Sequence, residues 1–169
     1  MYNCFFNGNS LYGEVLTQMQ PTAMAVVSGS KAYPDIYGMV HFYQLYNGLL
    51  LTAEFTGLPK SDNPCYIPFM GFHIHEGTSC TGTASDPFAD ALSHYNPDDC
   101  PHPAHRGDLP PVFNNNGYAW TCFFTDRFTV KEVVGRTVIV HSQADDFHTQ
   151  PSGNSGSMIA CGVISTIDG

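Results

Sequence analysis

The stretch IYGMVHFYQLYNGLLLTAEFTGL (residues 36–58) has the pattern of a β-hairpin. Two runs rich in apolar, β-branched and aromatic residues, 36–45 and 49–58, flank the pair Asn47-Gly48. Asn-Gly between two such runs is a strong signal for a tight hairpin turn, because both residues tolerate the positive φ angles that the turn requires. We therefore expect two antiparallel strands here.

Other short runs have the same strand character and are separated by turn residues. They lie at residues 23–27, 67–76, 117–130, 135–143 and 158–166. Two long segments rich in Pro, Gly, Ser and Asp, at 77–116 and 144–157, interrupt the series. Loops of this length in a compact domain are usually functional or disordered. Seven or eight short strands without an internal repeat predict an all-β fold, a Greek-key barrel or sandwich.

The composition supports a β-rich globular protein and argues against two classes of partner. The chain has 169 residues with 16 Gly and 12 Pro, and only 12% of its residues are charged. Six Lys and Arg stand against fifteen Asp and Glu, which gives a formal charge of −9. No nucleic acid is expected as a partner, because phosphate binding needs clustered cations, and an anionic substrate would meet a repulsive field. No run reaches the ~18 apolar residues of a membrane span, so no membrane partner is expected.

The cysteines and the first residues leave the compartment open. Six cysteines fit either several disulfides or a reduced set, and none of them forms a C-x-x-C pair. Thiolate zinc sites therefore receive little support. The opening MYNCFFNGNS lacks the basic start and apolar core of a signal peptide. A cleaved leader would give the same pattern, so the chain is either cytoplasmic or exported with its leader removed.

The sequence GFHIHE (71–76) places two histidines on one face of an expected strand. Side chains at positions i and i+2 of a strand point the same way, so His73 and His75 can reach one point in space. A single histidine is most often solvent-exposed or hydrogen-bonded, but further donors follow in the first long loop and after the strand at 135–143. These donors are His94, His102, His105, Asp108 and His141.

The donor types in this group indicate a metal centre. Imidazoles suit zinc or copper, and a carboxylate joined to histidines suits tetrahedral zinc. Two four-coordinate sites need eight donor positions. The seven side chains supply eight if one imidazole uses both of its ring nitrogens.

Several segments resemble those of Cu,Zn superoxide dismutases in order and context. They are GFHIHE, HYNP (94–97), HRGDLP (105–110), VIVHSQADD (138–146) and GNSGSMIACGVI (153–164). The resemblance covers about residues 23–165 and implies an eight-stranded Greek-key β-barrel with two long functional loops. It divides the chain into an N-terminal extension at 1–22, which can be an added strand, a dimer arm or a disordered tail, and a superoxide dismutase-like domain at 23–169.

The resemblance also implies which residues hold two cofactors, copper and zinc. The implied copper ligands are His73, His75, His94 and His141. The implied zinc ligands are His94, His102, His105 and Asp108, so the imidazolate of His94 bridges the metals. Asp145 is expected to hydrogen-bond ligands of both metals and to fix their ring tautomers. Cys80 and Cys161 match the disulfide of the family.

The implied activity is the disproportionation of superoxide to oxygen and hydrogen peroxide at copper, with zinc in a structural role. One superoxide gives up an electron and the next receives it, while the copper-side nitrogen of His94 is released and gains a proton. Superoxide is thus the implied partner. The sequence leaves a homodimer open.

The sequence departs from the family at two places. His102 and His105 are only three residues apart, much closer than the corresponding zinc ligands usually are, so the zinc loop is shortened although all four donors are present. Met158 in GSMIACG takes the place of the family's arginine, which draws the anion to copper, and the loop at 144–157 has no lysine. Weakened electrostatic guidance and slower dismutation are therefore expected.

Two other functions fit the same residues. One is a non-enzymatic copper- or zinc-binding protein, a metal buffer or chaperone on the same fold. The other is a structural interaction domain held together by zinc. Metal content and turnover, measured together, distinguish both from the enzyme.

Four cysteines lie outside the disulfide that the resemblance implies. Cys65 and Cys100 lie in loops beside the ligand segments, and a second disulfide between them is one of the pairings that the sequence leaves open. Cys4 and Cys122 are interpreted more simply as free thiols.

The remaining aromatic positions have simpler interpretations. His41 and His148 lie outside the ligand set and are expected at the surface. Trp120 is expected to fill the core or an interface.

Overall fold

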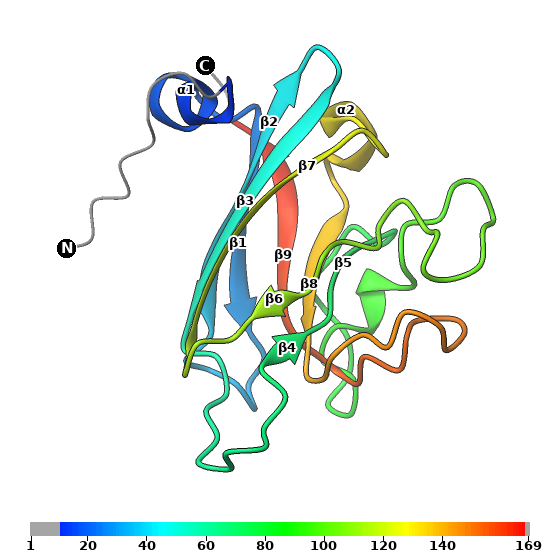
Figure 1. Ribbon diagram of the computed structural model, residues 1–169. Helices are drawn as coiled ribbons and strands as arrows, with labels where there is room; N and C mark the ends of the chain where they lie inside the picture. Colours follow the sequence, from blue (N-terminus) through cyan, green and yellow to red (C-terminus); the bar gives the residue numbers. More distant parts are fainter. Residues whose placement is uncertain (1–10, 168–169) are drawn as a thin grey trace.

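The computed structural model describes residues 11–167, which form mostly β-strands (Figure 1). The helices are α1 (Leu11–Gln18), the 3-10 helix η1 (Ala89–Ala91) and α2 (Val130–Val133). The strands are β1 (Ala23–Gly29), β2 (Tyr37–Leu45), β3 (Gly48–Thr56), β4 (Phe69–Met70), β5 (Phe72–His75), β6 (Val112–Phe113), β7 (Tyr118–Thr125), β8 (Thr137–His141) and β9 (Met158–Thr166). In this part of the chain no helix is long and apolar enough to cross a bilayer.

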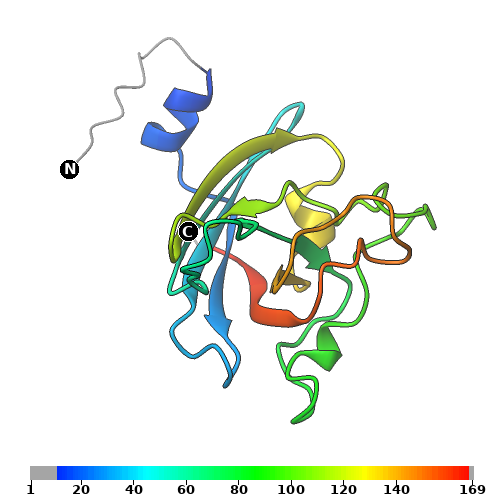
Figure 2. The same cartoon turned by 60° about the horizontal axis from the view of Figure 1, so that its bottom comes forward.

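Seven strands form one antiparallel sheet in the order β5-β8-β9-β1-β2-β3-β7, and β4 pairs with β6. The sheet curls into a barrel (Figures 1 and 2). The predicted hairpin is confirmed, because β2 and β3 pair in register from Tyr37↔Thr56 to Leu45↔Gly48. Its turn residues are Tyr46 and Asn47 rather than the predicted Asn47-Gly48, since Gly48 is the first residue of β3. The jump from β3 to β7 and from β5 to β8 gives the non-sequential order of a Greek key. The all-β fold class is therefore confirmed.

The concave face of the sheet encloses the main hydrophobic core. Phe42 of β2, Phe55 of β3 and Phe72 of β5 are fully buried there. The rings of Phe55 and Phe72 pack edge to face, with centroids 5.7 Å apart. Burying such a side chain stabilises the fold by ~1.5–3 kcal/mol. Because side chains alternate along a strand, anchoring Phe72 and Ile74 in the core turns His73 and His75 to the opposite side.

The strand boundaries differ from those expected in two places. The run at 67–76 divides at Gly71 into β4, which pairs with β6, and β5, which pairs with β8. A Cβ at Gly71 would press on Ser155 and His141. The run expected at 117–130 ends at Thr125, and α2 follows. A capping box begins this helix: Thr129 accepts a hydrogen bond from the Glu132 backbone N–H, and the Glu132 carboxylate accepts one from the Thr129 backbone N–H. Of the nine strands found within residues 11–167, β4 and β6 are only two residues long.

The extension before the barrel contains a helix rather than a strand. Helix α1 packs on the convex face of the sheet, where Val15 contacts a cluster with Tyr43 and Leu50, and Cys122 lies at its edge. Trp120 is on the same convex face with 48% of its surface exposed, so the expectation that it fills the core is wrong. An interface role for Trp120 stays a prediction.

One disulfide ties the first long loop to the last strand. Cys80 and Cys161 are bonded as predicted, across a sequence separation of 81 residues. Cys65, Cys100 and Cys122 are free thiols, so the second disulfide considered for Cys65 and Cys100 does not form. The prediction for Cys4 lies outside the described residues.

Candidate metal centre

Two long loops and the strands β5 and β8 bring the predicted donors together. Both loops, 76–111 and 142–157, lie on the same side of the barrel (Figures 1 and 2). The first loop pairs with β5 through single β-bridges, His75 with His94 and His73 with Asp108. His141 ends β8, which is the neighbour of β5 in the sheet. The backbone pairing therefore sets the relative positions of these side chains.

The seven predicted donors form two buried groups that share His94. In each group the potential ligand atoms all lie within 4.8 Å of one another. The first group, here called the four-histidine set, is His73, His75, His94 and His141. The second, called the carboxylate set, is His94, His102, His105 and Asp108. The arrangement of one imidazole between two sets follows the sequence-based hypothesis.

Backbone carbonyls orient two rings of the four-histidine set. His75 Nδ1 donates to the Leu92 carbonyl at 2.8 Å, and His141 Nδ1 donates to the Gly156 carbonyl at 3.3 Å. Each bond leaves the Nε2 atom of its ring available, and these two Nε2 atoms lie 3.3 Å apart. The tautomers are thus set so that both lone pairs face the same point.

The other two rings of the set present buried nitrogens that have no hydrogen-bond partner among the described residues. These atoms are His73 Nδ1 and His94 Nε2. A buried polar atom without a partner costs about 1–3 kcal/mol, so native structures rarely keep one without a reason. A metal ion bound by the four nitrogens would satisfy both atoms. The donor set therefore fits copper or zinc.

In the carboxylate set, three rings converge on one side chain. Asp108 Oδ1 lies 2.7 Å from His94 Nδ1 and 3.3 Å from His105 Nδ1, and Asp108 Oδ2 lies 3.1 Å from His102 Nδ1. The contact with His102 lacks hydrogen-bond geometry, so His102 Nδ1 also remains unsatisfied. Three imidazole nitrogens and one carboxylate match a closed tetrahedral zinc site.

The short spacing between His102 and His105 is sufficient to close this set. Gln150 clamps the turn, because it accepts from the His102 N–H at 2.9 Å and donates to the His102 carbonyl at 2.7 Å. Gly107 lets the loop approach β5, since a Cβ there would collide with the Ile74 carbonyl. The four potential donors therefore lie together although His102 and His105 are only three residues apart.

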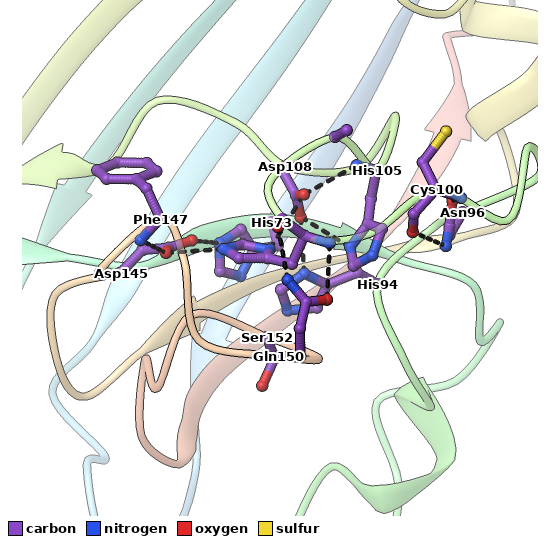
Figure 3. A network of polar contacts seen from close by, with 12 residues as sticks. His73, His94, Asn96, Cys100, His105, Asp108, Asp145, Phe147, Gln150 and Ser152 are labelled. Carbon is purple, nitrogen blue, oxygen red and sulfur yellow. Dashed lines mark hydrogen bonds and ion pairs between the residues drawn. The ribbon is translucent and has the colours of Figure 1, made fainter.

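Asp145 connects the two sets (Figure 3). It accepts from His73 Nε2 at 2.8 Å and from His102 Nε2 at 2.9 Å. The Phe147 backbone N–H donates to it at 2.7 Å. Figure 3 shows Asp145 and Phe147 on one side of this network, with Asp108, His94 and His105 on the other. Gly153 passes so close, with φ +66°, that a Cβ would collide with the Asp145 carboxylate.

Burial and hydrogen bonding set the charge state of these groups. Burial lowers the pKa of His73 to about 4 and that of His141 to about 3, and it also holds the pKa of His75 well below its ordinary value. Burial alone would raise the pKa of Asp145, but the hydrogen bonds from His73, Phe147 and His102 lower it further than burial raises it. Neutral imidazoles and an ionised carboxylate are the forms that bind metals and orient ligands.

A cavity of about 640 Å³ opens onto the four-histidine set. Its walls include His75, His94, His141 and Met158. The charged residues along it are both acidic, Glu76 and Asp86, together with neutral polar side chains. Among residues 11–167, neither lysine nor arginine lines it.

Sequence reasoning missed the groups that position the rings. The carbonyls of Leu92 and Gly156 carry no residue-type signature, because every residue has a carbonyl. The positive φ angles of Leu92 (61°) in the first loop and Gly156 (78°) in the second show that each loop turns sharply at its ring-orienting carbonyl. Only the Gly at 156 was visible as a signal in the sequence. His148 is exposed as predicted, whereas His41 is half-buried on the convex face.

Comparisons with known proteins agree with this geometry. The family model described as copper/zinc superoxide dismutase (SODC) matches residues 36–164. A superoxide dismutase [Cu-Zn] of Deinococcus radiodurans is 35% identical over 139 residues, 72% of each chain. One of Legionella pneumophila is 29% identical, over 93% of this chain and 94% of its own. The structure of the Cu/Zn superoxide dismutase from Brucella abortus matches with a TM-score of 0.69 and 25% identity, over 83% of this chain and 98% of that one. This chain belongs to the copper/zinc superoxide dismutase family.

Proposed function

We propose that this chain is a superoxide dismutase that holds copper in the four-histidine set and zinc in the carboxylate set. The observation that carries the proposal is the position of His94, whose two ring nitrogens face different sets. Its Nδ1 contacts Asp108, and its buried Nε2 has no hydrogen-bond partner in the described part of the chain. A bridging imidazolate is the simplest arrangement that satisfies both nitrogens.

The chemistry divides between the cofactor and the chain. Copper supplies one-electron chemistry, through which one superoxide is oxidised to oxygen and another, with two protons, is reduced to hydrogen peroxide. The chain supplies position and proton handling: His94 lines the cavity, and its Nε2 can hold a proton while Nδ1 stays against Asp108. Asp145, Leu92 and Gly156 keep the other rings in the tautomers that bind metal.

We further propose that electrostatic guidance of the substrate is weak. Met158 occupies the cavity wall without a charge, and the charged wall residues are Glu76 and Asp86. The three arginines lie in other contacts. Arg106 pairs with Asp98 and Glu132, Arg127 donates to the Ala104 carbonyl, and Arg136 stacks over Tyr95. A superoxide anion that approaches the cavity therefore meets no positively charged Lys or Arg side chain on its described walls.

The test measures metal content and turnover in the same sample. Protein from cells supplied with copper and zinc should contain one equivalent of each metal and should dismutate superoxide, more slowly than family members that keep the arginine. Higher ionic strength should leave the rate unchanged or increase it, since screening weakens repulsion. Copper without turnover would favour the metal-buffer hypothesis, and zinc alone would favour a structural domain. A steep fall of the rate with salt would contradict the weak guidance.

A further inference from the structure

An irregularity in the sheet places Met158 directly opposite His141, a member of the four-histidine set. Strands β8 and β9 pair regularly up to Val140↔Ala160, and the next pair is His141↔Met158. The register shift leaves Ile159 as an extra residue on β9. In a regular ladder His141 would stand opposite Ile159 instead.

The shift also determines which side of the sheet Met158 faces. Val140, Ala160 and Ile159 all belong to the barrel core. Met158 instead lies with the smaller cluster near the disulfide and lines the cavity together with His141. The irregularity therefore turns Met158 to the metal side of the sheet. Directly opposed residues of antiparallel strands have Cβ atoms about 4.5–5.5 Å apart, within reach of a flexible methionine.

The thioether of Met158 prefers one oxidation state of copper. Soft sulfur ligands select monovalent copper, whereas imidazoles bind both copper oxidation states and zinc. The same cavity is also lined by His75, His94 and His141. A sulfur at its wall adds a soft, uncharged donor to a site built from nitrogen.

We propose that the Met158 thioether is an additional ligand for monovalent copper in the four-histidine set. This inference rests on the proposed function, because it assigns copper to that set. It predicts that the chain retains Cu(I) more tightly than the histidines alone would, without changing its affinity for Cu(II). Met158 is then a specificity-determining ligand for the metal's oxidation state.

The competing explanation is that Met158 only fills apolar space. It packs against the cluster of Phe88, Ala91, Ile139 and Cys161, so a filling role is physically reasonable. Leucine has a similar volume and no sulfur, and such swaps usually preserve packing. Met158→Leu therefore removes the sulfur donor but fills the same apolar space. Met39→Leu, on β2 outside the cavity wall, is the matched control.

The experiment is a competition for Cu(I) between metal-free protein and a chromogenic Cu(I) chelator, with a parallel Cu(II) titration. Met158→Leu should weaken Cu(I) binding about tenfold, which is the size of loss seen when residues that support a metal site are mutated. It should leave Cu(II) binding unchanged. Met39→Leu should behave as wild type. X-ray absorption at the copper edge of the reduced wild-type protein should show a sulfur scatterer that is missing in Met158→Leu.

Unchanged Cu(I) affinity in Met158→Leu would overturn the ligand role. An equal loss for both oxidation states would also overturn it, because that result means altered packing. Wild-type protein that binds copper and turns over superoxide keeps the proposed function in either case. Wild-type protein that takes up no copper would instead refute the proposed function itself.

Discussion

Asp145 and Asp108 show how single carboxylates organise several imidazoles. Asp108 contacts the three imidazole rings of the carboxylate set, and Asp145 accepts a hydrogen bond from one ring of each set. Both carboxylates are buried with their partners, so each loses hydration that the hydrogen bonds must replace. The orientation of four of the six rings therefore depends on these two side chains.

The role of Asp145 can be tested by removing its carboxylate. Asp145→Ala frees His73 Nε2 and His102 Nε2, so both rings lose the bond that fixes their tautomers. We expect metal affinity to fall about 10- to 100-fold, measured by competition with zinc and copper chelators. Asp126→Ala removes the same charge from an exposed position and should leave affinity unchanged. Equal affinities in the two variants would contradict the orienting role.

Met158→Arg tests whether the missing charge limits the rate. A cation at the cavity wall should raise the dismutation rate constant about tenfold at low ionic strength, and added salt should reduce that gain. Met19→Arg makes the same change at an exposed position after α1 and should have little effect. If pulse radiolysis finds no gain in Met158→Arg, the absent charge is not the limitation.

At the scale of elements, β5 was the most predictable part of the site. Its two histidines alternate with Phe72 and Ile74, so the sequence pattern alone predicted which side chains share a face. Helix α2 was missed although Thr129 and Glu132 spell a capping box, because the preceding aromatic run favours a strand. The register shift beside His141 was not predictable, since no Gly or Pro marks it.

The disulfide should stabilise the elements that carry the site. Bonding Cys80 to Cys161 closes a loop with a sequence separation of 81 residues, which restricts the unfolded chain. Replacing both with serine should lower the free energy of unfolding by about 4 kcal/mol in urea titrations. Cys65→Ser, at an exposed free thiol, should change it by no more than about 0.5 kcal/mol. A loss in the double variant as small as in the control would contradict this role.

At the scale of the whole molecule, the donors come from residues 73 to 141, and the barrel is what brings them together. The sequence predicted the donor types and, through family resemblance, their division into two sets. It could not predict the distances between them, because these depend on loop paths held by Gln150, Gly107 and Gly153. The exposure of Trp120 was missed for a similar reason, since only the sheet order reveals which face stays uncovered.

The metal-free protein should lose stability as the pH falls from neutrality. The pKa values of His73 and His141 are lowered to about 4 and about 3, so the unfolded chain binds protons more readily than the folded one. The free energy of unfolding is unaffected by the titration of these two rings above the ordinary histidine pKa of about 6.5, and it falls progressively as the pH drops below that value. Between pH 6.5 and 5 we expect a loss of about 2 kcal/mol for each histidine, measured by urea unfolding. Constant stability over this range would contradict neutral burial of these rings.

The central claim is that His94 lies between two different metal ions. Crystals of the protein loaded with both metals can be measured by anomalous diffraction on either side of the copper and zinc absorption edges. We expect copper among His73, His75, His94 and His141, and zinc among His94, His102, His105 and Asp108, with the His94 ring between the two peaks. A single bound ion, or a His94 ring turned away from both sets, would contradict the account.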